Sequence, residues 1–172
     1  HYLARILANA DAMSQLIQGL LALAHVSQVE LIRTTVNLSD LAVDILQQFA
    51  AGQPQRRVRW SVEPGLVVLG DARLLRSIME NLLGNAWKFT AREAQAEIAV
   101  GGSRERGGYF LRDNGCGFDM AYADRLFGTF QRLHGADEYP GTGIGLPTVA
   151  RARARHGGKV GAQAGPGVGV GF

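Results

Sequence analysis

Residues 71–90, DARLLRSIMENLLGNAWKFT, decide the fold. Their apolar residues recur every three or four positions, which is the pattern of a helix with one buried face. Asp71 can cap the start of this helix, and we expect the helix to run to about Thr90. At about 100° per residue, the predicted core face comprises Leu75, Ile78, Met79, Leu82, Leu83, Ala86 and Phe89.

Three polar residues of the same helix, Asn81, Asn85 and Lys88, share one narrow stripe beside that face. Asparagine is unfavourable inside a helix because its amide competes for backbone hydrogen bonds, so two in register suggest a specific task. Amide oxygens suit Mg²⁺, which takes few protein ligands when phosphates supply the rest, and Lys88 would add a charge for those phosphates. From the helix alone, a solvated polar face with an isolated lysine is an equally good interpretation.

The flanking segments predict a mixed sheet with helices on one face. Runs of alternating or β-branched residues, separated by turn-forming glycine and proline, indicate strands. We expect strands at residues 34–38, 58–62, 66–69, 96–101, 109–112, 160–164 and 168–172, and further helices that begin at Asn37 or Ser39 and at Pro147. The predicted fold class is therefore α+β, a two-layer sandwich.

Residues 3–24 carry a heptad repeat, which predicts a helix of a coiled coil or helical bundle. Its two apolar positions are Leu3, Ala10, Ile17 and Ala24, and Ile6, Met13 and Leu20. Additional leucines widen the stripe, which favours a bundle. We expect this helix to pair with another chain, because no segment nearby in the sequence is an obvious packing partner. A helix that packs on its own domain is the alternative.

Composition excludes several classes of protein. The 172 residues suffice for one ordinary domain with a short appendage, and 47% apolar against 19% charged residues favours a packed chain over disorder. The 18 Lys and Arg residues are dispersed, so no basic stripe indicates a nucleic-acid partner. Cys116 has no disulfide partner, which fits a reducing compartment. No apolar run spans a bilayer, so we expect a cytoplasmic chain whose parent protein could be membrane-bound.

Two glycine-rich segments are candidate ligand loops. Residues 113–118, DNGCGF, follow a predicted strand, where a carboxylate can accept a hydrogen bond from an exocyclic amine and glycines let a flat ring approach. Many turns have this pattern, so it is a weak signal alone. Residues 141–146, GTGIGL, precede the Pro147 helix, and N–H groups at a helix start bind phosphate well. A flexible hinge is the alternative there.

Taken together, in this order and spacing, four segments resemble the catalytic domain of sensor histidine kinases of two-component systems. The similar segments are residues 79–90 for the N box, 113–118 for the G1 box, 126–133 (LFGTFQRL) for the F box and 141–146 for the G2 box. The subgroup that it resembles most is that of phytochrome-like and PAS-containing sensors. The resemblance implies a Bergerat-type α/β sandwich over residues 36–172, preceded at 1–35 by part of a dimerisation domain, its second helix.

The resemblance implies a metal and phosphate end of the site. Asn85 would hold Mg²⁺ with assistance from Asn81, and Lys88 and Arg132 would contact the phosphates of ATP. The phosphate cradle and the hinge of a lid would be formed by Gly141, Thr142, Gly143, Ile144, Gly145 and Leu146.

It also implies a base end. Asp113 would bind the adenine amine, with Phe89 near the ring and with room made by Gly115 and Gly117. Phe130 of the F box would be a further nucleotide-binding residue, and about residues 133–140 would be a short loop that closes over ATP.

The implied activity is that of a protein-histidine kinase, which transfers the γ-phosphoryl group of Mg-ATP to a histidine on a dimerisation helix. A response regulator and a second copy, paired through residues 3–24, would be its partners. Related hydrolases such as gyrase place a water-activating glutamate four residues before the metal-binding asparagine. Asn81 stands there in this chain, while Glu80 is expected to pair with Arg76. Without such a base, transfer to water should be slow.

Two departures from the family pattern open an alternative. No histidine lies in the phospho-accepting motif His-Glu/Asp-x-x-x-Pro, so the chain as it stands is not expected to phosphorylate itself and is interpreted as a fragment of a larger kinase. Residues 148–156 have alanine and arginine where the family has larger apolar residues, and the end of the chain is glycine-rich. The alternative function is a non-catalytic dimerisation and nucleotide-sensing module.

Overall fold

The computed structural model describes residues 30–103, 107–131, 139, 141–158, 160–165 and 169–171, together with single positions between Tyr2 and Ala24. The elements from residue 34 onward are β1 (Thr34–Asn37), α2 (Leu38–Gly52), β2 (Val58–Val62), β3 (Val67–Gly70), α3 (Ala72–Phe89), β4 (Ala96–Ser103), β5 (Gly108–Asp113), the 3₁₀ helix η1 (Met120–Arg125), α4 (Gly145–Arg155), β6 (Gln163–Gly165) and β7 (Gly169–Gly171).

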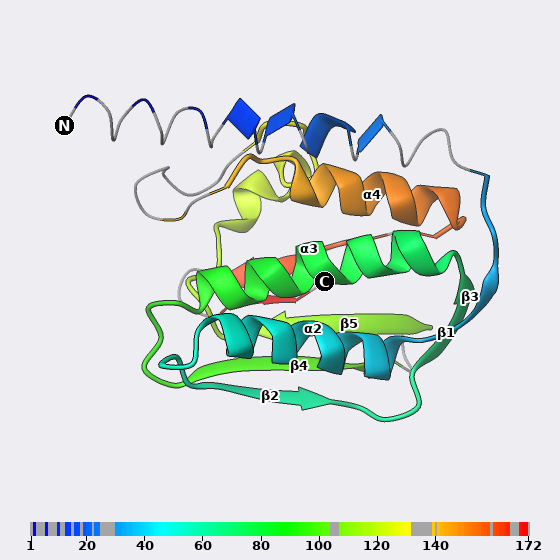
Figure 1. The fold of residues 1–172 in the computed structure, drawn as a ribbon, viewed down its shortest axis with the longest axis horizontal. Helices are drawn as coiled ribbons and strands as arrows, with labels where there is room; N and C mark the ends of the chain where they lie inside the picture. Colours follow the sequence, from blue (N-terminus) through cyan, green and yellow to red (C-terminus); the bar gives the residue numbers. More distant parts are fainter. Residues whose placement is uncertain are drawn as a thin grey trace.

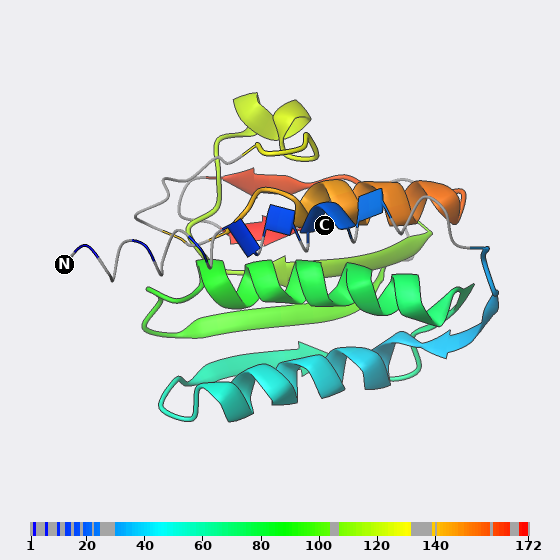
Figure 2. The ribbon, with the colours of Figure 1, turned by 45° about the horizontal axis from the view of Figure 1, so that its top comes forward.

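The predicted α+β sandwich is confirmed. A five-stranded sheet has the order β2-β4-β5-β7-β6, with β2 and β4 parallel and the other pairs antiparallel. Helices α2, α3 and α4 cover one face of this sheet (Figures 1 and 2). The predicted strands at 34–38 and 66–69 are present as β1 and β3, but these pair with each other in a separate two-stranded sheet.

Side-chain caps fix where the two long helices begin. Asn37 is the N-cap of α2, and its side chain accepts hydrogen bonds from the N–H groups of Ser39 and Asp40. Asp71 caps α3 in the same way, as predicted, by accepting from the N–H groups of Arg73 and Leu74. The Arg73 guanidinium, 2.8 Å from the Asp71 carboxylate, holds the pKa of Asp71 well below its usual range. Asp71 therefore stays ionised at the start of α3, where a negative charge is favourable.

The predicted core face of α3 is confirmed for six of its seven residues, which are all buried. Phe89 is the exception, because it lies in the last turn, is only half-buried and packs on Tyr139 instead. Trp87 is buried as well, although it falls outside the predicted band. Its ring reaches sideways to Phe49 and Trp60, so the core at this end of α3 is wider than the helix periodicity alone indicates.

The predicted strand at 160–164 is wrong in its first half. Residues 160–162 are not in a strand, β6 begins at Gln163, and the register joins β5 to β7 at Arg112 and Gly171. Gly161 has no side chain to pack, which weakens a strand at this point. A cavity of about 1090 Å³ lies between α3, α4 and β5, with Ile78, Val149 and Val160 among its lining residues.

The described positions between Tyr2 and Ala24 are helical. The later ones lie along the outer side of α4, and the N-terminal end extends beyond it (Figures 1 and 2). Two contacts hold them there: Gly19 packs against Ile144, and the Arg151 side chain donates a hydrogen bond to the Leu23 carbonyl oxygen. A Cβ atom on Gly19 would lie only 2.9 Å from Ile144 Cδ1. The helix therefore approaches α4 as closely as it does because residue 19 is glycine.

Most of the apolar side chains described in this N-terminal helix remain exposed. Ile6 and Met13 are each 62% exposed and Leu20 is 43% exposed, and these three form one of the two predicted heptad positions. Leu23 is buried. In the part of the chain that the structure describes, no helix has both the length and the apolarity that crossing a bilayer requires.

Candidate functional site

Asn81 connects the middle of α3 to the start of α4. Its amide nitrogen donates a hydrogen bond of 2.8 Å to the Ser77 carbonyl oxygen one turn earlier. This bond turns the amide oxygen toward Gly145, where a Cβ atom would lie 2.5 Å from Asn81 Oδ1. Two of the sequence-predicted site residues are therefore in contact, and glycine is required at position 145 for this fit.

The first turn of α4 presents backbone N–H groups without a side-chain cap. Ile144 occupies the N-cap position, is buried, and makes no capping hydrogen bond. Thr148 instead bonds its own turn, donating from both its N–H and its hydroxyl group to the Ile144 carbonyl oxygen. The N–H groups at the start of α4 can therefore bind an anion, as the GTGIGL pattern predicts.

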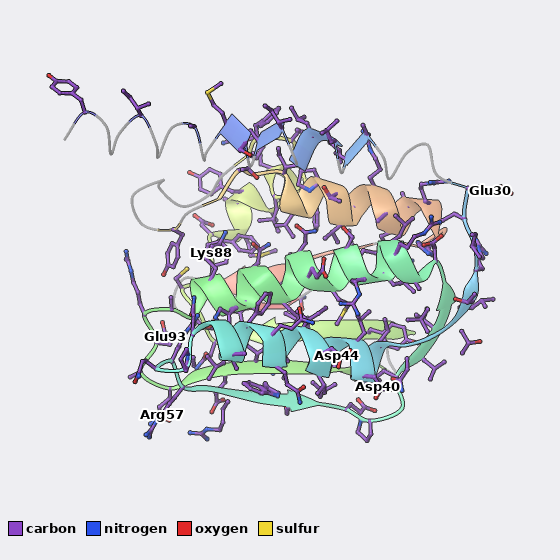
Figure 3. All side chains as sticks on the ribbon, viewed as in Figure 1. Glu30, Asp40, Asp44, Arg57, Lys88 and Glu93 are labelled. Carbon is purple, nitrogen blue, oxygen red and sulfur yellow. The ribbon has the colours of Figure 1, made fainter. Side chains whose placement is uncertain are left out.

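Lys88 and Phe89 form the corner of the site at the C-terminal end of α3. The Lys88 ammonium lies 4.2 Å from the centre of the Phe89 ring, and a Cβ atom on Gly141 would be 3.2 Å from Lys88 Nζ. Figure 3 shows Lys88 at this end of the helix, well apart from Asp40 and Asp44 on α2. Its positive charge is thus next to the glycine-rich segment that precedes α4.

The loop after β5 packs against the same end of α3. Asp113 is buried, with 3% of its surface exposed, and its Oδ1 accepts a hydrogen bond of 2.9 Å from the Gly115 N–H group. Cys116 donates its N–H group to the Phe89 carbonyl oxygen, and a Cβ atom on Gly115 would lie 2.7 Å from that oxygen. Gly117 has a φ of +61°, so glycine is favoured there too.

Phe130 joins the loop after η1 to the glycine-rich segment. Its N–H group donates to the Gly143 carbonyl oxygen at 3.0 Å, and its backbone has a φ of +63°, which is uncommon for a residue other than glycine. Gly143 also has a positive φ, and a Cβ atom there would meet the Gln131 carbonyl oxygen at 2.9 Å. The hydrogen bond and this close approach hold residues 130–131 against the segment that precedes α4.

The structure thus brings together most of the predicted site residues. Asn81 meets Gly145, Lys88 meets Gly141, Phe89 meets Gly115 and Cys116, and Phe130 meets Gly143. Asn85 shares the half-buried stripe of α3 with Asn81 and Lys88, and Thr142 and Leu146 lie within the segment that contains these glycines. Arg132 and most of the predicted lid, residues 133–138 and 140, lie outside the described residues.

Two residues that the sequence did not single out also shape the site. Asn114 ties the loop to the start of β4, since its side chain accepts from the Glu97 N–H group and donates to the Gln95 carbonyl oxygen. Tyr139 is buried against the Phe89 ring, with ring centres 5.0 Å apart. An aromatic residue immediately before Pro-Gly was the available signal for Tyr139.

The family of histidine kinase-, DNA gyrase B- and HSP90-like ATPases matches residues 70–172, which is more than half of the chain. This chain belongs to that family. The predicted pair between Arg76 and Glu80, the second residue of its N box, is confirmed at 3.7 Å. The ATPase domain thus has Asn81 four residues before Asn85, while Glu80, one position earlier, pairs with Arg76.

The ATPase domain is homologous to sensor histidine kinases. It is 37% identical to cyanobacterial phytochrome A from Nostoc sp. over 112 residues, which cover 64% of this chain and 14% of the relative. It is 30% identical to the sensor protein kinase PmrB from Pseudomonas aeruginosa over 162 residues, which cover 92% of this chain and 34% of the relative. The chain therefore spans a minor part of the length of these relatives.

The fold of the ATPase domain is that of histidine kinase catalytic domains. The structure of full-length ShkA in complex with AMPPNP superposes with a TM-score of 0.75 at 25% identity, and the match covers 99% of this chain and 37% of ShkA. The predicted Bergerat-type sandwich is confirmed by this likeness and by the family match.

Proposed function

We propose that this chain binds Mg-ATP and transfers the γ-phosphoryl group to a histidine of a dimerisation helix, as the catalytic part of a two-component sensor histidine kinase. The observation that carries the proposal is the contact between Asn81 and Gly145, which sets the polar stripe of α3 against the uncapped start of α4. An ATP-dependent signalling role places the chain in the cytoplasm, with a response regulator as the next recipient of the phosphoryl group.

The two ends of the site suit the two ends of ATP. The N–H groups at the start of α4 and the Lys88 ammonium offer positive charge for the phosphates. The buried Asp113 carboxylate can accept a hydrogen bond from the adenine amine, beside the half-buried ring of Phe89. Arg132 is proposed as a further phosphate contact on the strength of its place in the F box.

The donors on α3 fit Mg²⁺. The amide nitrogen of Asn81 is held by the Ser77 carbonyl oxygen, so its hard oxygen atom is the group directed toward the start of α4. Asn85, one turn further along the same stripe, is proposed as the principal protein ligand, and phosphate oxygens and water would complete the set. Bound there, Mg²⁺ would neutralise charge on the phosphates.

The proposed step is an in-line displacement. A neutral imidazole nitrogen attacks the γ-phosphorus, a nitrogen–phosphorus bond forms, and the bond to the bridging oxygen breaks to leave ADP. The residues of this chain bind and orient the phosphates. The Glu80 carboxylate lies 3.7 Å from the Arg76 guanidinium, and Asn81 is an amide, so neither supplies a base for attack by water.

Calorimetric titration with AMPPNP, with and without Mg²⁺, tests the binding half of this proposal. We expect affinity to rise with Mg²⁺ in the wild type and to lose this dependence in Asn85→Ala, while Asp113→Ala weakens binding under both conditions. Gln48→Ala on the exposed side of α2 is the matched control and should bind like the wild type. No binding at millimolar nucleotide would reject the proposal in favour of a non-catalytic module.

The transfer half requires the histidine-bearing partner. Incubation with γ-labelled ATP and a dimerisation domain that carries the phospho-accepting histidine of a related sensor kinase should yield a label that is acid-labile and alkali-stable, as expected of a phosphoramidate. A label on hydroxyl groups would contradict the proposed acceptor. Steady release of phosphate to water, lost in Asn85→Ala, would instead assign the chain to the hydrolysing branch of its family.

The exposed apolar side chains of the N-terminal helix support a second part of the proposal, a homodimer through residues 3–24. Ile6, Met13 and Leu20 repeat every seven residues and are exposed in the single chain. Light scattering should report a dimer that Ile6→Glu with Met13→Glu converts to a monomer. A monomeric wild type at high concentration would contradict this part while leaving nucleotide binding untouched.

A further inference from the structure

Tyr139 stands out because it is buried beside the proposed base end of the site. Only 7% of its surface is exposed, although it falls within the stretch that the sequence predicts to be a loop over the nucleotide. Its ring packs edge-on against Phe89, with ring centres 5.0 Å apart and an interplanar angle of 64°. The two rings are therefore in direct contact.

Two cations complete this aromatic pair. The Arg92 guanidinium carbon lies 5.0 Å from the centre of the Tyr139 ring, and the Lys88 ammonium lies 4.2 Å from the centre of the Phe89 ring. The order of groups is thus Arg92, Tyr139, Phe89 and Lys88, and each neighbouring pair is a favourable contact. Both rings are held in place before any ligand arrives.

The aromatic pair of Phe89 and Tyr139 is next to the Asp113 loop, because this loop contacts the backbone of Phe89. The Phe89 carbonyl oxygen accepts a hydrogen bond from Cys116, and Gly115 lies against the same carbonyl group. Phe89 is half-buried, so part of its surface remains open, whereas Tyr139 is almost fully covered. Of the two rings, Phe89 is the one with surface left for a ligand.

We propose that Tyr139 is a positioning residue: it fixes the Phe89 ring as the aromatic wall of the base pocket, and so sets affinity for the nucleotide base. This inference rests on the proposed nucleotide site and adds to it a residue that does not itself need to touch the ligand. Stacking of a base on an aromatic ring depends on the orientation of that ring, which is why a support behind Phe89 changes affinity.

A double-mutant cycle on ADP binding tests the proposal. Tyr139→Ala should weaken ADP binding about tenfold, and Tyr139→Phe should bind within about twofold of the wild type, because the ring provides the support. In a Phe89→Ala background, Tyr139→Ala should cost less than about twofold, because the wall that it supports is gone. A second full loss in the double variant would overturn the proposal, and so would equal losses in Tyr139→Ala and Tyr139→Phe.

Tyr122→Ala is the matched control, since Tyr122 is an aromatic residue of η1 that is 47% exposed and contacts Arg125. It should bind ADP like the wild type, and thermal unfolding of all variants checks that the fold is retained. If the wild type binds ADP and Tyr139→Ala binds equally well, this inference alone fails. If the wild type does not bind ADP, the proposed function fails first.

Discussion

The α2 side and the α4 side of the sheet differ in how completely their side chains fill space. On the α2 side, Trp87 packs on Phe49 and Trp60, its indole N–H group donates to Gln53, and Arg56 covers its ring at 4.8 Å. On the α4 side there is a cavity of about 1090 Å³, which Val149, Arg153 and His156 line. The C-terminal end of α3 is thus firmly packed, whereas the middle and the end of α4 border space that side chains do not fill.

This difference indicates which part of the site is preformed. The polar stripe of α3 and the Asp113 loop are attached to the well-packed side, so their geometry exists before ligand binding. The middle and the end of α4 border the cavity through Val149, Arg153 and His156, and segments with few buried apolar contacts have low local stability. Ligand binding is therefore expected to stabilise the α4 side more than the α2 side.

The largest expected effect is on the free energy of unfolding, and it compares one buried side chain from each side of the sheet. Leu83→Ala removes a fully buried side chain from α3 and should lower the free energy of unfolding by about 3 kcal/mol. Val149→Ala removes an almost equally buried side chain that lines the cavity, and should cost only about 1 kcal/mol because fewer atoms are lost and packing there is already incomplete. Urea unfolding measures both, and equal losses would contradict the comparison.

The second-largest expected effect is on the free energy of unfolding when the N-cap of α3 is removed, and this effect should depend on pH. Asp71→Ala should lower the free energy of unfolding by about 1–2 kcal/mol at neutral pH through loss of the cap. Because Arg73 lowers the pKa of Asp71 in the folded state, this contribution is present above the unfolded pKa, near 4, and is lost as the pH falls below it. Denaturant titrations from pH 7 to pH 3 should show the difference between wild type and variant shrinking, and a constant difference would contradict the assigned cause.

A larger side chain in the cavity should improve packing on the α4 side and bring it closer to that of the α2 side. A Cβ atom on Gly161 would meet no other atom within 4 Å, and Gly161 has no positive φ. Gly161→Ala should raise the free energy of unfolding by about 0.5 kcal/mol by restricting the unfolded chain. Gly161→Val should add a further few tenths of a kcal/mol by contact with the cavity wall. If the valine variant is no more stable than the alanine variant, the cavity is not filled from this position.

The smallest effect concerns Glu80. Its pair with Arg76 is about half exposed, so Glu80→Gln should change the free energy of unfolding by less than about 0.5 kcal/mol. Because Glu80 is assigned no catalytic task, phosphoryl transfer should be unchanged as well. A large loss of phosphoryl transfer with unchanged stability would show that Glu80 acts in the reaction. A residue outside the polar stripe would then also be catalytic.

The well-packed side was also the side that the sequence predicted best. Helix periodicity and Asp71 located α3 to within one residue, because burial of one face and a side-chain cap are local properties of the sequence. Trp87 was missed because its burial depends on Phe49 and Trp60, which lie far away in the sequence. The strand at 160–164 was placed from alternation alone, and the lack of a side chain at Gly161 outweighed that pattern.

The site shows the same division. Positive φ at Gly117 and Gly143 and the close fit at Gly145 agree with glycine-rich patterns that could be read directly. The contact between Asn81 and Gly145, the strained backbone of Phe130 and the burial of Tyr139 each depend on segments that meet only in the folded chain. The sequence therefore indicated most residues of the candidate site, and only the structure indicates which of them contact one another.

The contact between Gly19 and Ile144 favours the rotational setting of the N-terminal helix in which residue 19 faces α4. A helix advances by about 100° per residue, so a turn of one position would bring a neighbour such as Leu20 against Ile144 in place of Gly19. The larger side chain would push the two helices apart, at the residue directly before the uncapped N–H groups of α4. We therefore expect a rotation of the N-terminal helix to displace the segment that is proposed to hold the phosphates.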